Sequence, residues 1–226
     1  MTDKIPTSLA QTRKNFVDLV NTNAWQWKKP KTKRPYPVFF ITLTFEKNVQ
    51  DLTYANKEFL KWIKKFNYAV YGKKGARLCY LAVPQFQKRG AVHYHILFFN
   101  IPYLKGGMYD KIESTWKHGT FWNVEKVNER TIEKTINYLS RYMFKNFFDD
   151  RMFGRRRYMA SRNIKRPVVI RDDVEIEMFL MKTKRGGVLF PHVLHKEEFS
   201  VFSEFMGLLD VQEIYFDTRV CLTKYI

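Results

Sequence analysis

The chain has 226 residues, of which 45% are apolar and 17% aromatic, so it can form one large domain with a sizeable core and is not a disordered protein. Its 40 basic residues outnumber 22 acidic ones and give a net charge of +18, which favours a polyanionic partner. No apolar run reaches the length of a membrane span, the first residues lack a signal-peptide core, and two isolated cysteines exclude a disulfide framework. We therefore expect a protein of the reducing cytosol that binds nucleic acid and not a membrane.

Residues 1–35 are predicted to form an N-terminal helix and a basic linker. The apolar pattern favours a helix within residues 8–27. Residues 28–35 contain two prolines and five cations, and this composition is typical of a solvated linker or of an arm that contacts phosphate.

Residues 36–45, Tyr-Pro-Val-Phe-Phe-Ile-Thr-Leu-Thr-Phe, are predicted to form a strand. Apolar side chains on both of its faces indicate a central strand that is covered on both sides, and Thr42 and Thr44 mark its polar end. A helix follows over residues 53–71, in which we expect Thr53 to be the N-cap and Leu60 to lie on the buried stripe.

Residues 80–99 hold two apolar runs around a short basic turn, which predicts a β-hairpin. If the loop is Lys88-Arg89-Gly90, with Gly90 in the left-handed conformation, Gln85 lies directly opposite His93. His95 shares their face because strand side chains repeat every second residue. One oxygen and two imidazole nitrogens can hold a divalent cation and leave positions open for substrate. The alternative is that both histidines are cross-strand polar partners on a half-exposed sheet.

A helix over residues 109–116 and a strand over residues 120–127 are expected next, before a helix over residues 131–148. From residue 36 onward the order of elements is then strand, helix, strand, strand, helix, strand, helix. This order indicates an α+β fold with a central, mostly antiparallel sheet of about five strands flanked by helices.

The helix predicted at residues 131–148 has two distinct faces. Its buried stripe consists of apolar residues three and four positions apart: Ile132, Ile136, Leu139 and Met143. Tyr138, Tyr142 and Lys145 share another face, roughly 110–130° from that stripe. A tyrosine oxygen can attack a phosphodiester, and Lys145 can neutralise the phenolate or a phosphate oxygen. The alternative is a pair of tyrosines that simply flank a core helix.

Residues 151–171 interleave basic side chains with Tyr158, which suits a groove that tracks a nucleic-acid strand. An acidic helix is predicted from Asp172, a turn at Gly186-Gly187, a helix from about Glu197 and a strand over residues 213–222. We expect residues 36–171 to form the main domain and residues 172–226 to be an accessory segment packed on it.

Three motifs occur in order: Phe40-Ile-Thr-Leu-Thr-Phe45, His93-Tyr-His95, and Tyr138-Leu-Ser-Arg-Tyr142 followed by Lys145. With these motifs the sequence resembles the HUH endonucleases, in particular the rolling-circle replication initiators of phages and plasmids. The runs 87–95 and 154–162 are also similar to this branch. The resemblance implies the HUH endonuclease fold, which is RRM-like.

The resemblance implies a metal-dependent, sequence-specific endonuclease that nicks and joins single-stranded DNA through a 5′-phosphotyrosine intermediate and so initiates rolling-circle replication. Tyr142 is the implied nucleophile and Tyr138 a second nucleophile or helper. His93, His95 and Gln85 are the implied ligands of Mg²⁺ or Mn²⁺, although relatives usually carry glutamate at the place of Gln85. The basic residues that we expect to bind DNA are Lys88, Arg89, Arg155, Arg156, Arg157, Arg162, Lys165 and Arg166.

The expected partner is single-stranded DNA of a replication origin, with or without a hairpin. Because no Gly-x-x-x-x-Gly-Lys-[Ser/Thr] motif occurs, we expect a separate helicase and polymerase, supplied by the host in its cytosol. The alternatives are a transposase or conjugative relaxase with the same chemistry, a non-catalytic module that binds single-stranded nucleic acid, and a regulator that has lost cleavage.

Overall fold

The computed structural model describes residues 9–73, 75, 77–170, 174–175, 178, 193–203, 207–216 and 220–225. The chain divides into two compact units, residues 1–164 and 165–226, and each unit has its own sheet. The expected packing of residues 172–226 on the main domain stays a prediction.

The first unit is built on a five-stranded antiparallel sheet with the strand order β4-β1-β3-β2-β5. The strands are β1 (Val38–Thr44), β2 (Tyr80–Phe86), β3 (Val92–Phe98), β4 (Phe121–Val127) and β5 (Met159–Ala160). The predicted α+β fold is confirmed, since the elements follow in the expected order and β1 lies between β3 and β4. This architecture agrees with the HUH and RRM-like folds.

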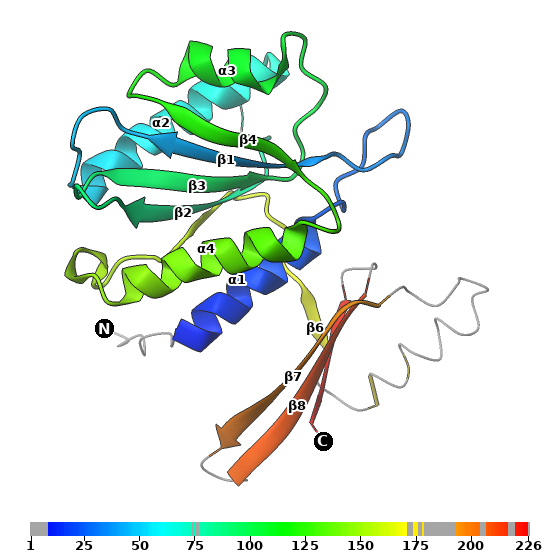
Figure 1. Cartoon of the computed structure of the whole chain (residues 1–226). Coiled ribbons are helices and arrows are strands. Elements are labelled where there is room, and N and C mark those ends of the chain that lie inside the picture. The colour runs from blue at the N-terminus through cyan, green and yellow to red at the C-terminus, as the bar shows by residue number, and fades with distance from the viewer. Residues whose placement is uncertain are drawn as a thin grey trace. The chain divides into compact units, whose positions relative to one another are not determined.

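Helices cover both faces of this sheet (Figure 1). The cores place α2 (Leu52–Tyr71) and α3 (Gly107–Thr115) on one face, and α1 (Leu9–Asn23) and α4 (Ile132–Phe147) on the other. Strand β1 supplies both cores, because Ile41 and Leu43 face α2 whereas Val38 and Phe40 face α1 and α4. A short 3₁₀ helix, Asp150–Met152, follows α4.

Helix α2 begins earlier than the sequence pattern suggested, because its N-cap is Asp51 and not Thr53. The Asp51 carboxylate accepts a hydrogen bond from the Thr53 amide at 2.8 Å. The expectation that Leu60 lies on the buried stripe is also wrong, since this side chain is 45% exposed. Trp62 is buried in its place, because Phe59, Trp62 and Phe66 recur at three and four residues on the side that faces the sheet.

Residues 28–35 form a closed loop between α1 and β1 and not an extended linker. Lys28 and Pro35 form an antiparallel bridge, and the Tyr36 amide donates to the Trp27 carbonyl at 2.8 Å. The five cations of this segment are therefore carried on a loop whose two ends are held together. That the loop contacts phosphate stays a prediction.

The second unit contains β6 (Val168–Ile170), β7 (Val193–Ser203), β8 (Gly207–Phe216) and β9 (Val220–Tyr225), in the order β6-β9-β8-β7. The helix expected from Glu197 is wrong, because this segment pairs with β8 along nearly its whole length. The strand expected over residues 213–222 is instead split between β8 and β9. Most of the helix expected from Asp172, and the turn at residues 186–187, lie outside the described residues.

Across the described ranges, no helix has both the length and the apolar character that a membrane span requires.

Candidate active site

The β2–β3 hairpin has the predicted geometry. Gln85 pairs with His93, and the Gly90 amide donates to the Gln87 carbonyl at 2.8 Å to close the turn. Gly90 has φ +89°, a left-handed conformation that side chains with a Cβ rarely adopt. The hairpin therefore places the side chains of Gln85, His93 and His95 on one face of the sheet, the face covered by α1 and α4.

The three side chains converge on one atom. Gln85 Oε1 lies 3.0 Å from His93 Nε2 and 2.8 Å from His95 Nε2. On its other side, His95 Nδ1 lies 3.0 Å from Thr42 Oγ1. If Nδ1 donates to Thr42, the Nε2 lone pair of His95 points to the same place as the Gln85 oxygen.

Both imidazoles are neutral at physiological pH. Burial, and to a lesser degree the charge of Arg89, lowers the pKa of His93 to about 4. Burial, and then the neighbouring His93, lowers the pKa of His95 to about 3. Neutral imidazole is the form that binds a metal ion, so both histidines are available as ligands without losing a proton first.

This donor set fits a divalent cation. Two ligands at right angles, each about 2.1 Å from an ion, are about 3.0 Å apart, which is close to the observed separations around Gln85 Oε1. Thr44 pairs with His93, and its buried Oγ1 has no hydrogen-bond partner in the described part of the chain. The described residues contain no cluster of three His, Cys, Asp or Glu side chains, so the amide of Gln85 has to be the third protein ligand.

Helix α4 brings two tyrosines over the histidines. The Tyr142 ring is stacked on His95, with 4.3 Å between ring centres and 7° between ring planes. The edge of Tyr138 meets both rings, 5.6 Å from His95 and 4.7 Å from Tyr142. Burial and a hydrogen bond with Tyr138 raise the pKa of Tyr142 well above its usual value, so this residue is a neutral phenol in the free protein.

Lys145 lies one turn further along α4. Its Nζ is 5.8 Å from the centre of the Tyr142 ring. The side of α4 that faces the core carries Leu139 and Met143, which are buried against the sheet. The structure thus brings together the three predicted ligands, both predicted tyrosines and the predicted lysine.

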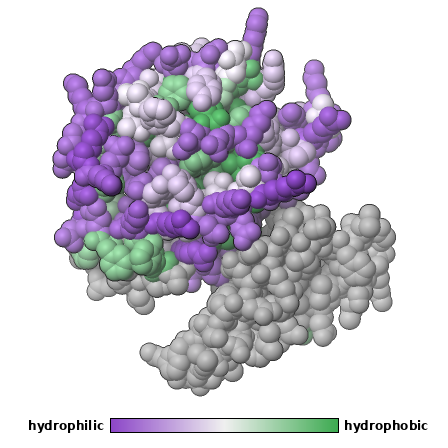
Figure 2. Space-filling model, in the orientation of Figure 1, coloured by the Kyte–Doolittle hydropathy of each residue, from purple (hydrophilic) through white to green (hydrophobic). Residues whose placement is uncertain are grey.

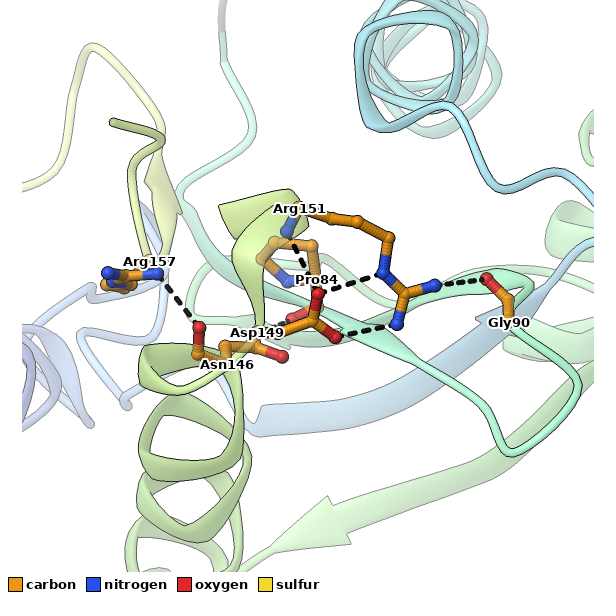
Figure 3. A network of polar contacts seen from close by, with 6 residues as sticks. All are labelled: Pro84, Gly90, Asn146, Asp149, Arg151 and Arg157. Atoms are coloured by element: carbon orange, nitrogen blue, oxygen red, sulfur yellow. Dashed lines mark hydrogen bonds and ion pairs between the residues drawn. The ribbon is translucent and has the colours of Figure 1, made fainter. Parts of the chain in front are cut away.

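The end of α4 is fastened to the hairpin by polar contacts that sequence reasoning missed (Figure 3). The buried Asn146 side chain donates to the Pro84 carbonyl of β2, and Arg157 donates to the Asn146 carbonyl at 2.9 Å. Arg151 lies 3.6 Å above the Phe86 ring while its guanidinium binds Asp149. These contacts hold the tyrosine helix and the histidine hairpin in a fixed relation.

The predicted DNA-binding residues have different positions. Arg89 donates to the carbonyls of Phe45 and Glu46, and Arg157 to those of Asn146 and Met152, so both guanidinium groups support the local backbone. Exposed side chains are those of Lys88, Arg155, Arg156 and Arg162. Lys165 and Arg166 belong to the second unit. Figure 2 shows hydrophilic side chains over much of the visible face of the first unit.

Comparison with known protein families gives one result that bears on this site. Residues 38–147 match the family model of the replication-associated protein ORF2, a family of phage rolling-circle initiators of the HUH type. The matched segment runs from the start of β1 to the end of α4 and contains every residue of the cluster described above. Neither the curated proteins nor the solved structures contain a significant match to the chain.

Proposed function

We propose that this chain, whose residues 38–147 belong to the replication-associated protein ORF2 family, is a metal-dependent and sequence-specific endonuclease for single-stranded DNA. It nicks and rejoins a replication origin through a 5′-phosphotyrosine intermediate and so initiates rolling-circle replication. The proposal is supported above all by the stacking of Tyr142 on His95, because it puts a phenol beside a convergent set of neutral metal ligands.

In the forward step the Tyr142 oxygen attacks the scissile phosphorus. A bond forms between that oxygen and phosphorus, and the bond from phosphorus to the 3′ oxygen breaks. The phenol gives up its proton and the departing 3′ oxygen takes one up, so the products are a 5′-phosphotyrosine and a free 3′-hydroxyl. Joining is the reverse, with a 3′-hydroxyl as the attacking group.

His93, His95 and Gln85 would hold Mg²⁺ or Mn²⁺, which when bound supplies Lewis-acid polarisation of the scissile phosphate. Thr42 orients His95 through Nδ1, because a partner on one ring nitrogen decides the direction and the tautomer of the other.

Tyr138 and Lys145 act on Tyr142. Because Tyr138 shares a hydrogen bond with Tyr142, it can hold the nucleophile in place and accept the second attack in a later joining step. Lys145 carries a positive charge close to the developing phenolate, which favours loss of the phenol proton as the DNA approaches.

The test is a denaturing gel of end-labelled, mixed-sequence single-stranded DNA incubated with the protein and Mn²⁺. The expected result is a slowly migrating covalent adduct that forms only with metal and is lost on chelation before mixing. Tyr142→Phe should abolish the adduct, alone or together with Tyr138→Phe. His93→Ala with His95→Ala should abolish it while binding remains, since phosphate contacts supply most of the affinity.

Tyr68→Phe is the matched control, because Tyr68 is 57% exposed on α2, across the sheet from the proposed site. This variant should form the adduct as the unmodified protein does. DNA binding with no adduct under any metal would instead establish a non-catalytic binding module.

A further inference from the structure

A pocket of about 500 Å³ lies at the opposite end of β1 from the threonines of the site. It is lined by the end of α1, the start of β1, the end of β4 and the turn before α4: Trp25, Pro37, Lys126, Val127, Asn128, Glu129 and Arg130. None of these residues belongs to the proposed catalytic cluster. In Figure 1 the start of α4 and the blue 28–35 loop lie at the same end of the sheet.

The pocket combines an apolar wall with two cations. Trp25, Pro37 and Val127 supply flat or apolar surface, and the exposed side chains of Lys126 and Arg130 lie in the same lining. Within the described part of the chain, neither of these two cationic side chains makes a hydrogen bond or an ion pair. Glu129 is the carboxylate in this lining, so a bound phosphate is favoured on the side of the two cations.

Trp25 occupies a backbone conformation that favours other residues. Its φ is +56°, just after the end of α1 at Asn23. This left-handed position after a helix is usually taken by glycine or asparagine, and a bulky side chain there is strained. Strained residues persist where the surrounding structure holds them and are concentrated at binding sites. The ring is thus held at the pocket at a cost in backbone energy.

The neighbouring loop adds charge to the same region. Trp25 and Pro37 lie just outside the closed 28–35 loop, whose ends are joined between Trp27 and Tyr36. Its cations are Lys28, Lys29, Lys31, Lys33 and Arg34. A pocket with an aromatic wall, two cations in its lining and five more on an adjoining loop matches a nucleotide, in which a flat base is attached to an anionic backbone.

We propose that this pocket binds one nucleotide of the single-stranded DNA, with the base on Trp25 and the backbone phosphate at Lys126 and Arg130. The inference rests on the proposed function for the identity of the ligand as DNA. Arg130 precedes Tyr138 by eight residues, or about 12 Å along α4. At about 3.4 Å per stacked nucleotide, the pocket holds a nucleotide roughly three or four positions from the scissile phosphate.

The experiment measures fluorescence anisotropy of a labelled, mixed-sequence single-stranded 20-mer with the full chain. Lys126→Gln with Arg130→Gln should weaken binding about tenfold and reduce the slope of log K against log salt by about 1.4, the value for two phosphate contacts. The matched control is Lys64→Gln with Lys65→Gln, which removes the same charge from exposed positions on α2. If both pairs weaken binding equally, the effect is one of net charge and the proposal is wrong.

Trp25→Leu and Trp25→Phe separate stacking from simple apolar filling. The leucine variant should bind DNA about 5- to 150-fold more weakly, whereas phenylalanine should retain most of the affinity. Equal binding by both, with thermal unfolding unchanged, would overturn the placement of a base on Trp25. If Trp25→Leu does not fold, the Lys126 and Arg130 pair still decides whether the pocket binds the backbone.

The same preparations are assayed for the covalent adduct, so that the two proposals fail separately. An adduct with the unmodified protein, together with unweakened binding by the pocket variants, would remove the pocket and leave nicking intact. Weakened binding by the pocket variants, together with no adduct under any metal, would keep the pocket and remove nicking. At saturating DNA the Lys126 and Arg130 variant should form the adduct at the normal rate.

Discussion

The two faces of the same five-stranded sheet are packed in very different ways. On the face covered by α2 and α3, aromatic rings pack continuously, as where Trp62 stacks on Phe66 with 4.9 Å between ring centres and Phe98 meets Phe66 at 5.5 Å. On the face covered by α1 and α4, the apolar core includes Leu97 and Phe99 but gives way to threonines and histidines toward the hairpin.

This difference shows how one sheet divides stability from chemistry. Neighbouring residues of β3 point to opposite faces, so Tyr94 is stacked on Phe59 while His95 faces Tyr142. Buried imidazoles, an amide and hydroxyl groups cost desolvation energy, and the apolar face supplies the burial that offsets it. The α2 face should therefore dominate the unfolding energy, and the α4 face should dominate activity.

The largest expected effect tests the apolar face. Phe66→Ala should lower the free energy of unfolding by about 3–5 kcal/mol, because it empties space next to Trp62 and Phe98 in a fully buried cluster. Urea unfolding followed by circular dichroism measures it. Leu60→Ala on the same helix is the control and should cost far less, since that side chain is 45% exposed. Similar losses for both variants would contradict the packing described for α2.

The next effect is a pH dependence that belongs to the site face. The pKa of His95 is about 3 in the folded protein and about 6.5 when unfolded, so below about pH 6.5 the unfolded chain binds a proton that the folded protein does not. Stability is then complete above that pH and is lost on acidification, by up to about 1.4 kcal/mol per pH unit for this residue.

Urea unfolding of the metal-free protein between about pH 7 and about pH 5 measures this dependence. His95→Gln should flatten it, whereas His118→Gln should leave the slope as it is, because His118 is a partly exposed residue outside the site. An equally steep dependence in the His95 variant would show that other groups cause the acid sensitivity.

Asn146→Ala should connect the two readouts. It removes the donor to the Pro84 carbonyl at a buried position, which we expect to cost about 1–3 kcal/mol of stability. It should also slow adduct formation, because the end of α4 loses a tie to the hairpin. Asp149→Ala is the comparison, as it removes a more exposed part of the same network. A normal rate of adduct formation in Asn146→Ala would restrict this residue to a purely structural role.

The smallest effect on folding is expected at Thr42. Thr42→Val keeps the shape but removes the oxygen next to His95 Nδ1, so Mn²⁺ affinity measured by calorimetry should fall about 10- to 100-fold. Thr42→Ser keeps the oxygen and should retain the affinity. Unchanged affinity in the valine variant would show that Thr42 does not orient the imidazole.

Much of the candidate site follows from local pattern. The alternation of strand residues and a three-residue loop ending in Gly90 are sufficient to place Gln85 opposite His93, and the structure confirms that register. Helical periodicity likewise separates Tyr138 and Tyr142 from the buried Leu139 and Met143. These features depend on residues that are close in sequence.

Other features depended on contacts between distant segments. The helix expected from Glu197 is strand β7, because its pairing with β8 outweighs local periodicity. The Asn146 contact joins residues 62 positions apart, and the pocket at Trp25 is assembled from four separate elements. The sequence by itself determined the α+β order, the hairpin and the tyrosine face, because each is set by the geometry of a single strand, turn or helix. Only the tertiary structure decided that Tyr142 is stacked on His95 and that α4 is tied to the hairpin, because these depend on how non-local surfaces pack.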